Sequence, residues 1–162
     1  MLKRMSLYAS HRPVEVVRFW RDENYLDLNA TYQRGDVWGN RRRVNLIRSI
    51  LLGIPIPSII INDRDKARWD DGDYSVVVID GKQRITSILM FLDSELAVPA
   101  EWFGETGAGD TITFSRLQMV NQRRFRNSTL AFSEGALPDL ASEKEVFDLV
   151  NFGGVPQGES DE

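Results

Sequence analysis

Residues 74–92 change their hydrophobic pattern at a single point, and this change constrains the fold more than any other feature of the sequence. Residues 74–79 form a run rich in β-branched side chains, which is typical of a buried strand. Asp80 and Gly81 end that run, and apolar residues then recur at helical spacing over residues 85–92. The pattern predicts a strand that passes through a tight turn directly into a helix.

Weaker patterns predict the other elements. A helix is expected from Pro13 through Trp20 and another over residues 41–52, where Gly53 stops it. Brief strands are expected at residues 26–28 and 59–61, the second joined by a long hairpin loop to the strand before Asp80.

Toward the end of the chain the patterns are less regular. Residues 98–139 show no sustained period and are expected to hold short strands or irregular connections. Ser142 and Glu145 have the spacing of a capping box and open a last helix, with Val146, Phe147 and Val150 facing inward.

The composition limits the classes of protein to which the chain can belong. Its 162 residues, 42% of them apolar, suit one folded domain, expected over residues 1–156, with a flexible acidic tail over residues 157–162. The sequence has no cysteine and one histidine, His11, so it excludes disulfides, thiolate catalysis and a zinc site. No apolar run approaches the roughly 20 residues of a membrane helix, and a cytoplasmic protein without membrane contact is expected.

Arginines gather in two short segments, although the formal net charge of the chain is −4. One group lies at residues 41–43 and 48, the other at residues 123, 124 and 126. A net negative charge argues against indiscriminate coating of nucleic acid, but local clusters still attract phosphate. By spacing alone, the basic side of the helix over residues 41–52 points to solvent or to a ligand, and a solvated face is the commoner case.

The turn before the helix is a candidate site for an anion. A strand that ends in glycine leaves unpaired backbone N–H groups and the positive end of the helix dipole at one point. Gly81 allows the backbone to come close to a ligand, and Lys82 and Arg84 supply charged hydrogen-bond donors. Asp80 is able to hold a metal ion, orient a water or cap the helix. The alternative is a simple capped turn whose polar residues are solvated. Neither a Walker A loop nor a dinucleotide fingerprint is present.

Two further segments have the chemistry of a ligand site. Tyr32, Gln33 and Arg34, together with Trp38, combine flat aromatic surface, an amide and a guanidinium, a set that suits a nucleotide. The alternative is that the aromatic rings pack on the core and Arg34 forms a structural salt bridge. Residues 151–156 read either as a helix C-cap or as a backbone nest for an anion.

Taken together, these segments resemble a known family: the ParB-like, sulfiredoxin-fold domain that forms the N-terminal part of GmrSD-type modification-dependent endonucleases. Four ordered blocks carry the resemblance, and they lie at residues 32–38, 47–57, 79–86 and 147–156. Each block is short, but their order and spacing along most of the chain make coincidence improbable.

The resemblance implies a compact α/β (α+β) domain in which a small mixed sheet is flanked by helices. It also implies binding, and often hydrolysis, of a nucleoside triphosphate, within restriction or phage-defence machinery that handles DNA. The residues it implies for catalysis are Asp80, Gln83 and Arg84. Those it implies for nucleotide binding are Tyr32, Gln33, Arg34, Gly81, Lys82, Thr86, Asn151, Gly153 and Gly154. Magnesium is expected at Asp80.

The sequence departs from the family pattern in two places. Lys82 stands where the family signature, Asp-Gly-Gln-Gln-Arg, has its first glutamine, so nucleotide binding is better supported than hydrolysis. The sequence ends shortly after residue 156, and the HNH-type nuclease that often follows is not expected in this short form. The alternative function is therefore a catalytically inactive module that binds a nuclease, a host factor or DNA. Intrinsic nuclease activity is least favoured, because no cluster of metal ligands is evident.

Overall fold

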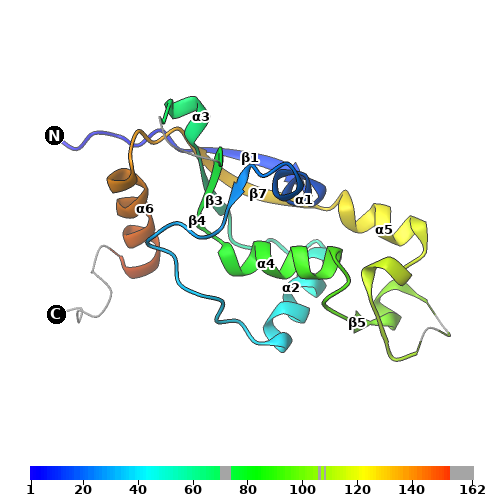
Figure 1. Ribbon diagram of the computed structural model, residues 1–162. Helices are drawn as coiled ribbons and strands as arrows, with labels where there is room; N and C mark the ends of the chain where they lie inside the picture. The colour runs from blue at the N-terminus through cyan, green and yellow to red at the C-terminus, as the bar shows by residue number, and fades with distance from the viewer. Residues whose placement is uncertain (70–73, 106, 108, 154–162) are drawn as a thin grey trace.

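The centre of the molecule is a mixed sheet. The computed structural model describes residues 1–69, 74–105, 107 and 109–153. The order across the sheet is β1 (Tyr8–Pro13), β7 (Thr129–Gly135), β3 (Ile59–Asp63), β4 (Val76–Asp80) and β2 (Leu26–Asp27). The pairs β1/β7 and β3/β4 are antiparallel, whereas β7/β3 and β4/β2 are parallel. The sheet and its helices (Figure 1) confirm the predicted α/β class. The ParB-like and sulfiredoxin-like detail stays a prediction.

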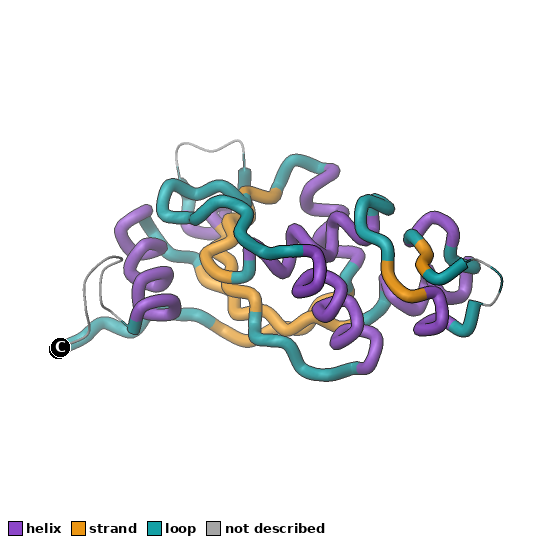
Figure 2. The backbone as a smooth tube through the Cα atoms, turned by 90° about the horizontal axis from the view of Figure 1, so that it is seen from below, coloured by secondary structure: helices purple, strands orange, loops and turns teal. Residues whose placement is uncertain are grey.

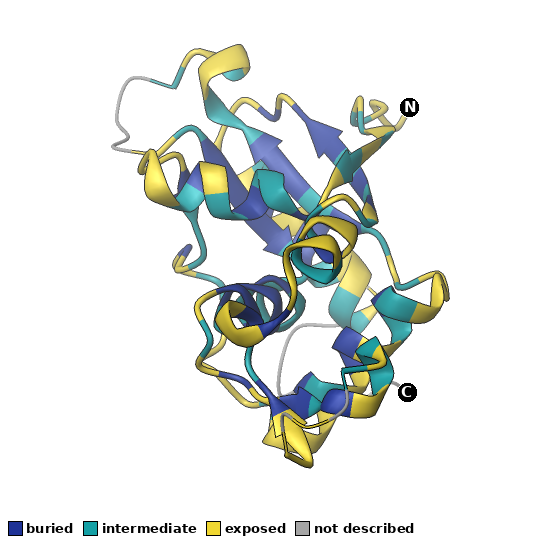
Figure 3. Ribbon diagram, turned by 90° about the vertical axis from the view of Figure 1, so that its right-hand side faces the viewer, coloured by how far each residue is buried: buried dark blue, intermediate teal, exposed yellow. Residues whose placement is uncertain are grey.

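Helices cover both faces of the sheet at β4. One hydrophobic core joins its Val76 and Val78 to three helices, α1 (Glu15–Asp22), α2 (Asn40–Leu52) and α4 (Lys82–Leu92). On the other face, Ile79 packs with α6 (Leu140–Phe152). A strand that is covered on both faces carries apolar residues without alternation, which explains the continuous run before Asp80. Figure 3 shows the resulting buried centre.

A smaller group of short elements lies at the end of the molecule far from α6 (Figures 1 and 2). It contains the two-stranded sheet of β5 (Val98–Pro99) and β6 (Thr111–Ile112), the 3-10 helices η1 (Ala100–Phe103) and η2 (Phe114–Arg116), and α5 (Met119–Arg126). Phe91 of α4 contacts the rings of Phe103, Phe114 and Phe125. The expected short strands are present, but neither α5 nor β7 was foreseen.

Two boundaries near the N-terminus and in the hairpin differ from expectation. Residues 8–13 form strand β1, so Pro13 ends a strand and the helix begins only at Glu15. The connection between β3 and β4 contains a short helix, α3 (Arg64–Ala67), where a loop was predicted. Its N-cap is Asp63, whose side chain accepts the backbone N–H of Lys66, and this cap stabilises a turn too short to show periodicity.

The start of α6 also corrects the prediction. Asp139 is the N-cap, and its carboxylate accepts the backbone N–H of Ser142 at 2.8 Å. This hydrogen bond and a second one, donated by the Ser142 hydroxyl at 2.8 Å, lower the pKa of Asp139. Ser142 therefore lies inside the first turn, and Val150, expected to face inward, is exposed.

The division into a domain over residues 1–156 and a tail beyond stays a prediction, because the tail lies outside the described residues. Within the described part of the chain, no helix has the length and apolar character needed to cross a membrane.

Candidate functional site

The turn between β4 and α4 has the predicted strand-to-helix form. Gly81 adopts φ +108°, and a Cβ there would lie 3.1 Å from both Ile59 Cγ1 and Arg84 Nη2. The positive φ therefore favours glycine, and any side chain would also crowd Ile59. The N–H of Ile85 donates to Gly81 O at 3.0 Å, and no side chain caps the helix. The amides of residues 82–84 precede the first intrahelical bond and are unsatisfied by α4 itself.

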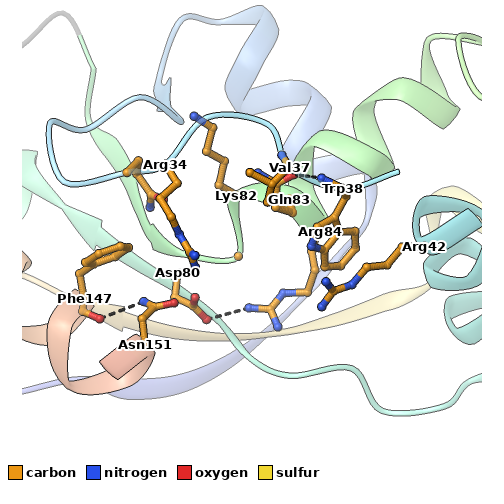
Figure 4. A pocket seen from close by; sticks show the side chains of 12 residues that line it. Arg34, Val37, Trp38, Arg42, Asp80, Lys82, Gln83, Arg84, Phe147 and Asn151 are labelled. Atoms are coloured by element: carbon orange, nitrogen blue, oxygen red, sulfur yellow. Dashed lines mark hydrogen bonds and ion pairs between the residues drawn. The ribbon is translucent and has the colours of Figure 1, made fainter. Parts of the chain in front are cut away.

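A pocket of about 310 Å³ opens at this turn (Figure 4). Its walls come from the loop after β2, from the start of α2, from the turn and from α6. The residues that line it are Gln33, Arg34, Val37, Trp38, Arg42, Asp80, Gly81, Lys82, Gln83, Arg84, Phe147 and Asn151. Eight of the expected site residues are thus brought together.

Asp80 and Arg84 form an ion pair inside this pocket. Arg84 Nη2 donates to Asp80 Oδ2 at 2.8 Å, and the two side chains are 11% and 24% exposed. Arg84 Nε is buried and has no hydrogen-bond partner among the described residues. Asp80 is therefore not the cap of α4, and the guanidinium that it holds retains an unused donor.

Arg34 approaches the same part of the pocket from another direction. Figure 4 shows the side chains of Arg34 and Arg84 both pointing toward Asp80. The guanidinium of Arg34 lies 5.9 Å from the ring centre of Phe152, and it forms no salt bridge within the described residues. The structural salt bridge considered from the sequence is absent there. Lys82 instead points away from Asp80, with Nζ 3.1 Å from Asn29 Oδ1.

The two glutamines of the pocket bind the protein backbone. Gln83 Oε1 accepts the N–H groups of Val37 and Trp38 at 3.2 and 3.3 Å, and its Nε2 donates to Gly35 O at 3.1 Å. Gln33 Nε2 donates to two carbonyls of β4 at 2.7 Å each. Gln83 thereby fastens the irregular loop over residues 35–38 to the first turn of α4, which fixes that wall of the pocket.

The structure adds Val37, Arg42 and Phe147 to the predicted site, and it places Trp38, which the sequence grouped with Gln33 and Arg34, in the same pocket. Arg42 lies over the ring of Trp38, 4.3 Å from its centre. The sequence signal for Arg42 was its position at the start of a helix, four residues after the aromatic Trp38.

Arg43, the next residue, contradicts the prediction of a uniformly solvent-facing basic side. It is buried, pairs with Asp36 and donates to Ser87 Oγ at 3.1 Å. A buried arginine is tolerated because these partners satisfy its charge and its donors.

Some expected site residues lie away from the pocket. Tyr32 does not line it, and its hydroxyl donates to Glu143 Oε2 at 3.1 Å. Burial and the neighbouring Glu143 raise the pKa of Tyr32. Thr86 and Gly153 do not line it either; Gly153 ends α6 with φ +61°, and Gly154 lies outside the described residues.

The pocket offers few ligands for a metal ion. No group of three or more histidine, aspartate or glutamate side chains suitable for a metal occurs in the described part of the chain. Of the described residues that line the pocket, Asp80 alone carries a carboxylate. A divalent ion there would need further oxygen ligands from a bound molecule, such as phosphate.

Comparison with known families places this geometry in context. The model of the family described as GmrSD restriction endonuclease, N-terminal domain, matches residues 20–140. The match covers most of the chain and every pocket residue except Phe147 and Asn151. No curated protein matches the sequence.

Proposed function

The chain belongs to the family of GmrSD restriction endonuclease N-terminal domains, and from this premise we propose that its pocket binds a nucleoside triphosphate. Membership links the chain to modification-dependent restriction and phage defence. The observation that carries the proposal is the convergence of Arg34 and Arg84 beside the unsatisfied amides at the start of α4.

These groups suit phosphoryl oxygens in charge and geometry. A helix N-terminus favours an anion through its free N–H groups and its dipole. A guanidinium presents a planar fork that matches phosphate, and Arg84 keeps a buried Nε without a partner. Because Gly81 has no side chain, phosphate oxygens are able to approach the backbone of the turn closely.

The rest of the pocket suits the remaining parts of a nucleotide and its metal ion. Asp80 and phosphate oxygens would together hold magnesium, which neutralises phosphate charge. The flat surface formed by Trp38 and Arg42 would contact the sugar or the base. Asn151 closes the opposite wall, where its Nδ2 donates to Phe147 O at 2.9 Å.

A second function, an interaction module that binds nucleotide without turnover, is favoured by one observation. Gln83, implied in catalysis by the resemblance, makes three hydrogen bonds to the backbone of the loop over residues 35–38. A side chain engaged in this way is not available to orient an attacking water. In this function the nucleotide-bound domain would bind DNA, a host factor or a separate nuclease.

The decisive experiment compares nucleotide binding by the wild-type chain, Arg84→Ala and the charge-matched control Arg4→Ala. Isothermal titration calorimetry with each nucleoside triphosphate and magnesium should show binding to the wild type and to the control. Loss of charged hydrogen bonds should weaken binding by Arg84→Ala about 10- to 100-fold. Equal affinity in Arg84→Ala would refute the site. Phosphate release, measured on the same samples, separates hydrolysis from binding alone.

A further inference from the structure

Helix α2 presents a basic stripe on the side away from the core. Its exposed residues Arg41, Asn45, Arg48 and Leu52 are spaced by four, three and four positions, so they share one side of the helix. Among the 13 residues of α2 there are four arginines and no acidic residue, in a chain of net charge −4. The stripe is therefore a local positive region on an otherwise acidic protein.

The fold joins this stripe to the second arginine cluster of the sequence. Helix α5 has three arginines and no acidic residue among its eight positions. Arg124 of α5 and Arg48 of α2 line one groove of about 410 Å³, although they are 76 positions apart in the sequence. Trp102 and Leu51 form apolar parts of its wall. Arg48 and Arg124, which do not line the nucleotide pocket, thus meet at one surface.

The cationic groups of this surface have no carboxylate partner among the residues that the structure describes. Within the described ranges, Arg41, Arg48 and Arg124 take part in none of the salt bridges of the molecule. Arg48 lies 5.8 Å from the ring centre of Trp102, a contact that leaves its donors unused. Glu101 is the acidic side chain among the described residues that line the groove.

We propose that this α2/α5 groove binds the phosphate backbone of double-stranded DNA. Arg124 of α5 lines the groove together with Arg48, and Arg41 extends the basic side of α2 two helical turns, about 10 Å, beyond Arg48. Such a row suits a polyanion whose charges repeat along its length. Membership of a restriction endonuclease family favours DNA over an acidic protein as that polyanion. The apolar wall at Trp102 would pack against deoxyribose.

The groove is separate from the nucleotide pocket, and the inference does not rest on the proposed function. Arg42 lines that pocket, whereas Arg48 and Arg124 line the groove. The Arg84→Ala variant should therefore keep its affinity for DNA even where nucleotide binding is lost.

The test measures the fluorescence anisotropy of a labelled duplex of mixed sequence, without nucleotide, over a series of salt concentrations. The double variant Arg48→Ala/Arg124→Ala should bind at least about tenfold more weakly. Its slope of log affinity against log salt should fall by about 2, because each lost phosphate contact removes about 0.9. The control Lys3→Ala/Arg4→Ala, with the same change in charge, should keep the wild-type slope. All these side chains are exposed, and matching melting temperatures would establish that each variant is folded.

Three results would overturn the proposal. An unchanged salt slope in the double variant would remove these arginines from the interface. An equal loss of affinity in the control would show that the effect depends only on the net charge of the protein. Tighter binding of polyglutamate or of a single-stranded oligonucleotide than of the duplex would assign the groove to a different anion.

Discussion

Two arginine–carboxylate pairs lie at opposite ends of the β3/β4 hairpin, and they differ in how completely they are satisfied. At one end, Glu143 of α6 is fully buried and accepts hydrogen bonds on both oxygens, from Asn62, Arg64 and Tyr32. Burial alone would lower the pKa of Arg64, but its hydrogen bonds and its attraction to Glu143 outweigh that and raise it.

At the other end, Asp80 and Arg84 are joined by a single ion pair, and Arg84 retains a buried donor without a partner in the described residues. Among the described residues, no buried polar atom of the Glu143 cluster lacks a hydrogen-bond partner, so the cluster serves to fasten α6 to β3 and to the loop at Tyr32. The Asp80–Arg84 pair faces a pocket and keeps one buried N–H donor without a partner, so a ligand is able to accept that hydrogen bond. Incomplete satisfaction of hydrogen-bond donors, rather than charge, distinguishes the candidate site from the structural cluster.

The largest expected effect tests the structural side of this comparison. Glu143→Ala leaves the largely buried guanidinium of Arg64 without its carboxylate and removes one acceptor from the buried Asn62, so the free energy of unfolding should fall by about 3–5 kcal/mol. Urea denaturation followed by circular dichroism measures it. The control Glu145→Ala, on the exposed side of the same helix, should change stability by less than about 0.5 kcal/mol. A loss under 1 kcal/mol for Glu143→Ala would show that the cluster is dispensable.

A smaller effect is expected at the incomplete pair. Asp80→Asn removes a negative charge from the pocket and releases Arg84, so a triphosphate without magnesium should bind roughly tenfold more tightly, about 1.4 kcal/mol. Added magnesium should no longer strengthen binding, because the carboxylate ligand is gone. Calorimetry with and without magnesium tests both effects, with Asp65→Asn as an exposed control. Persistent magnesium dependence would place the ion elsewhere.

The smallest effect concerns Tyr32 and depends on pH. Because the pKa of Tyr32 is raised on folding, its contribution to stability is complete below the unfolded pKa of about 10 and is lost as pH rises above that value. Among the four tyrosines, one should resist ionisation until the protein unfolds, as followed by tyrosinate absorbance. Tyr32→Phe should lack this resistant group and lose about 1 kcal/mol of stability at neutral pH. Four tyrosines that titrate together would contradict the assignment.

The sequence predicted those parts of the fold that depend on residues close together in the chain. The turn at Gly81 and the end of α2 at Gly53 were both predicted from local spacing, and both glycines adopt positive φ. Strand β1 was missed because residues 8–13 have no apolar alternation. It forms by pairing with β7, more than 100 positions away, where Arg12 and Ser10 bind Glu134. Burial alone would raise the pKa of Glu134, but these hydrogen bonds outweigh it and lower the pKa.

The same limit applies to the candidate site. The sequence identified Arg34, Asp80 and Arg84, which the structure brings to one pocket. It gave no means of telling that Gln83 would be engaged by a loop 45 or more positions earlier, or that Arg43 would be buried beside Ser87. Such outcomes depend on contacts between elements distant in sequence, and identical residue types then acquire different roles.

Three consecutive arginines at the start of α2 fix the rotational orientation of that helix in the domain. Neighbouring helical residues point about 100° apart, so Arg41 faces solvent, Arg42 the pocket at the Gly81 turn and Arg43 the interior. Rotating the helix by one residue would expose the buried Arg43, break its ion pair with Asp36 and drive an unpaired guanidinium inward. The helix is thereby locked against rotation about its own axis. If the two proposed sites are coupled through α2, a signal between the proposed DNA groove and the proposed nucleotide pocket would pass as a shift along or a tilt of the helix.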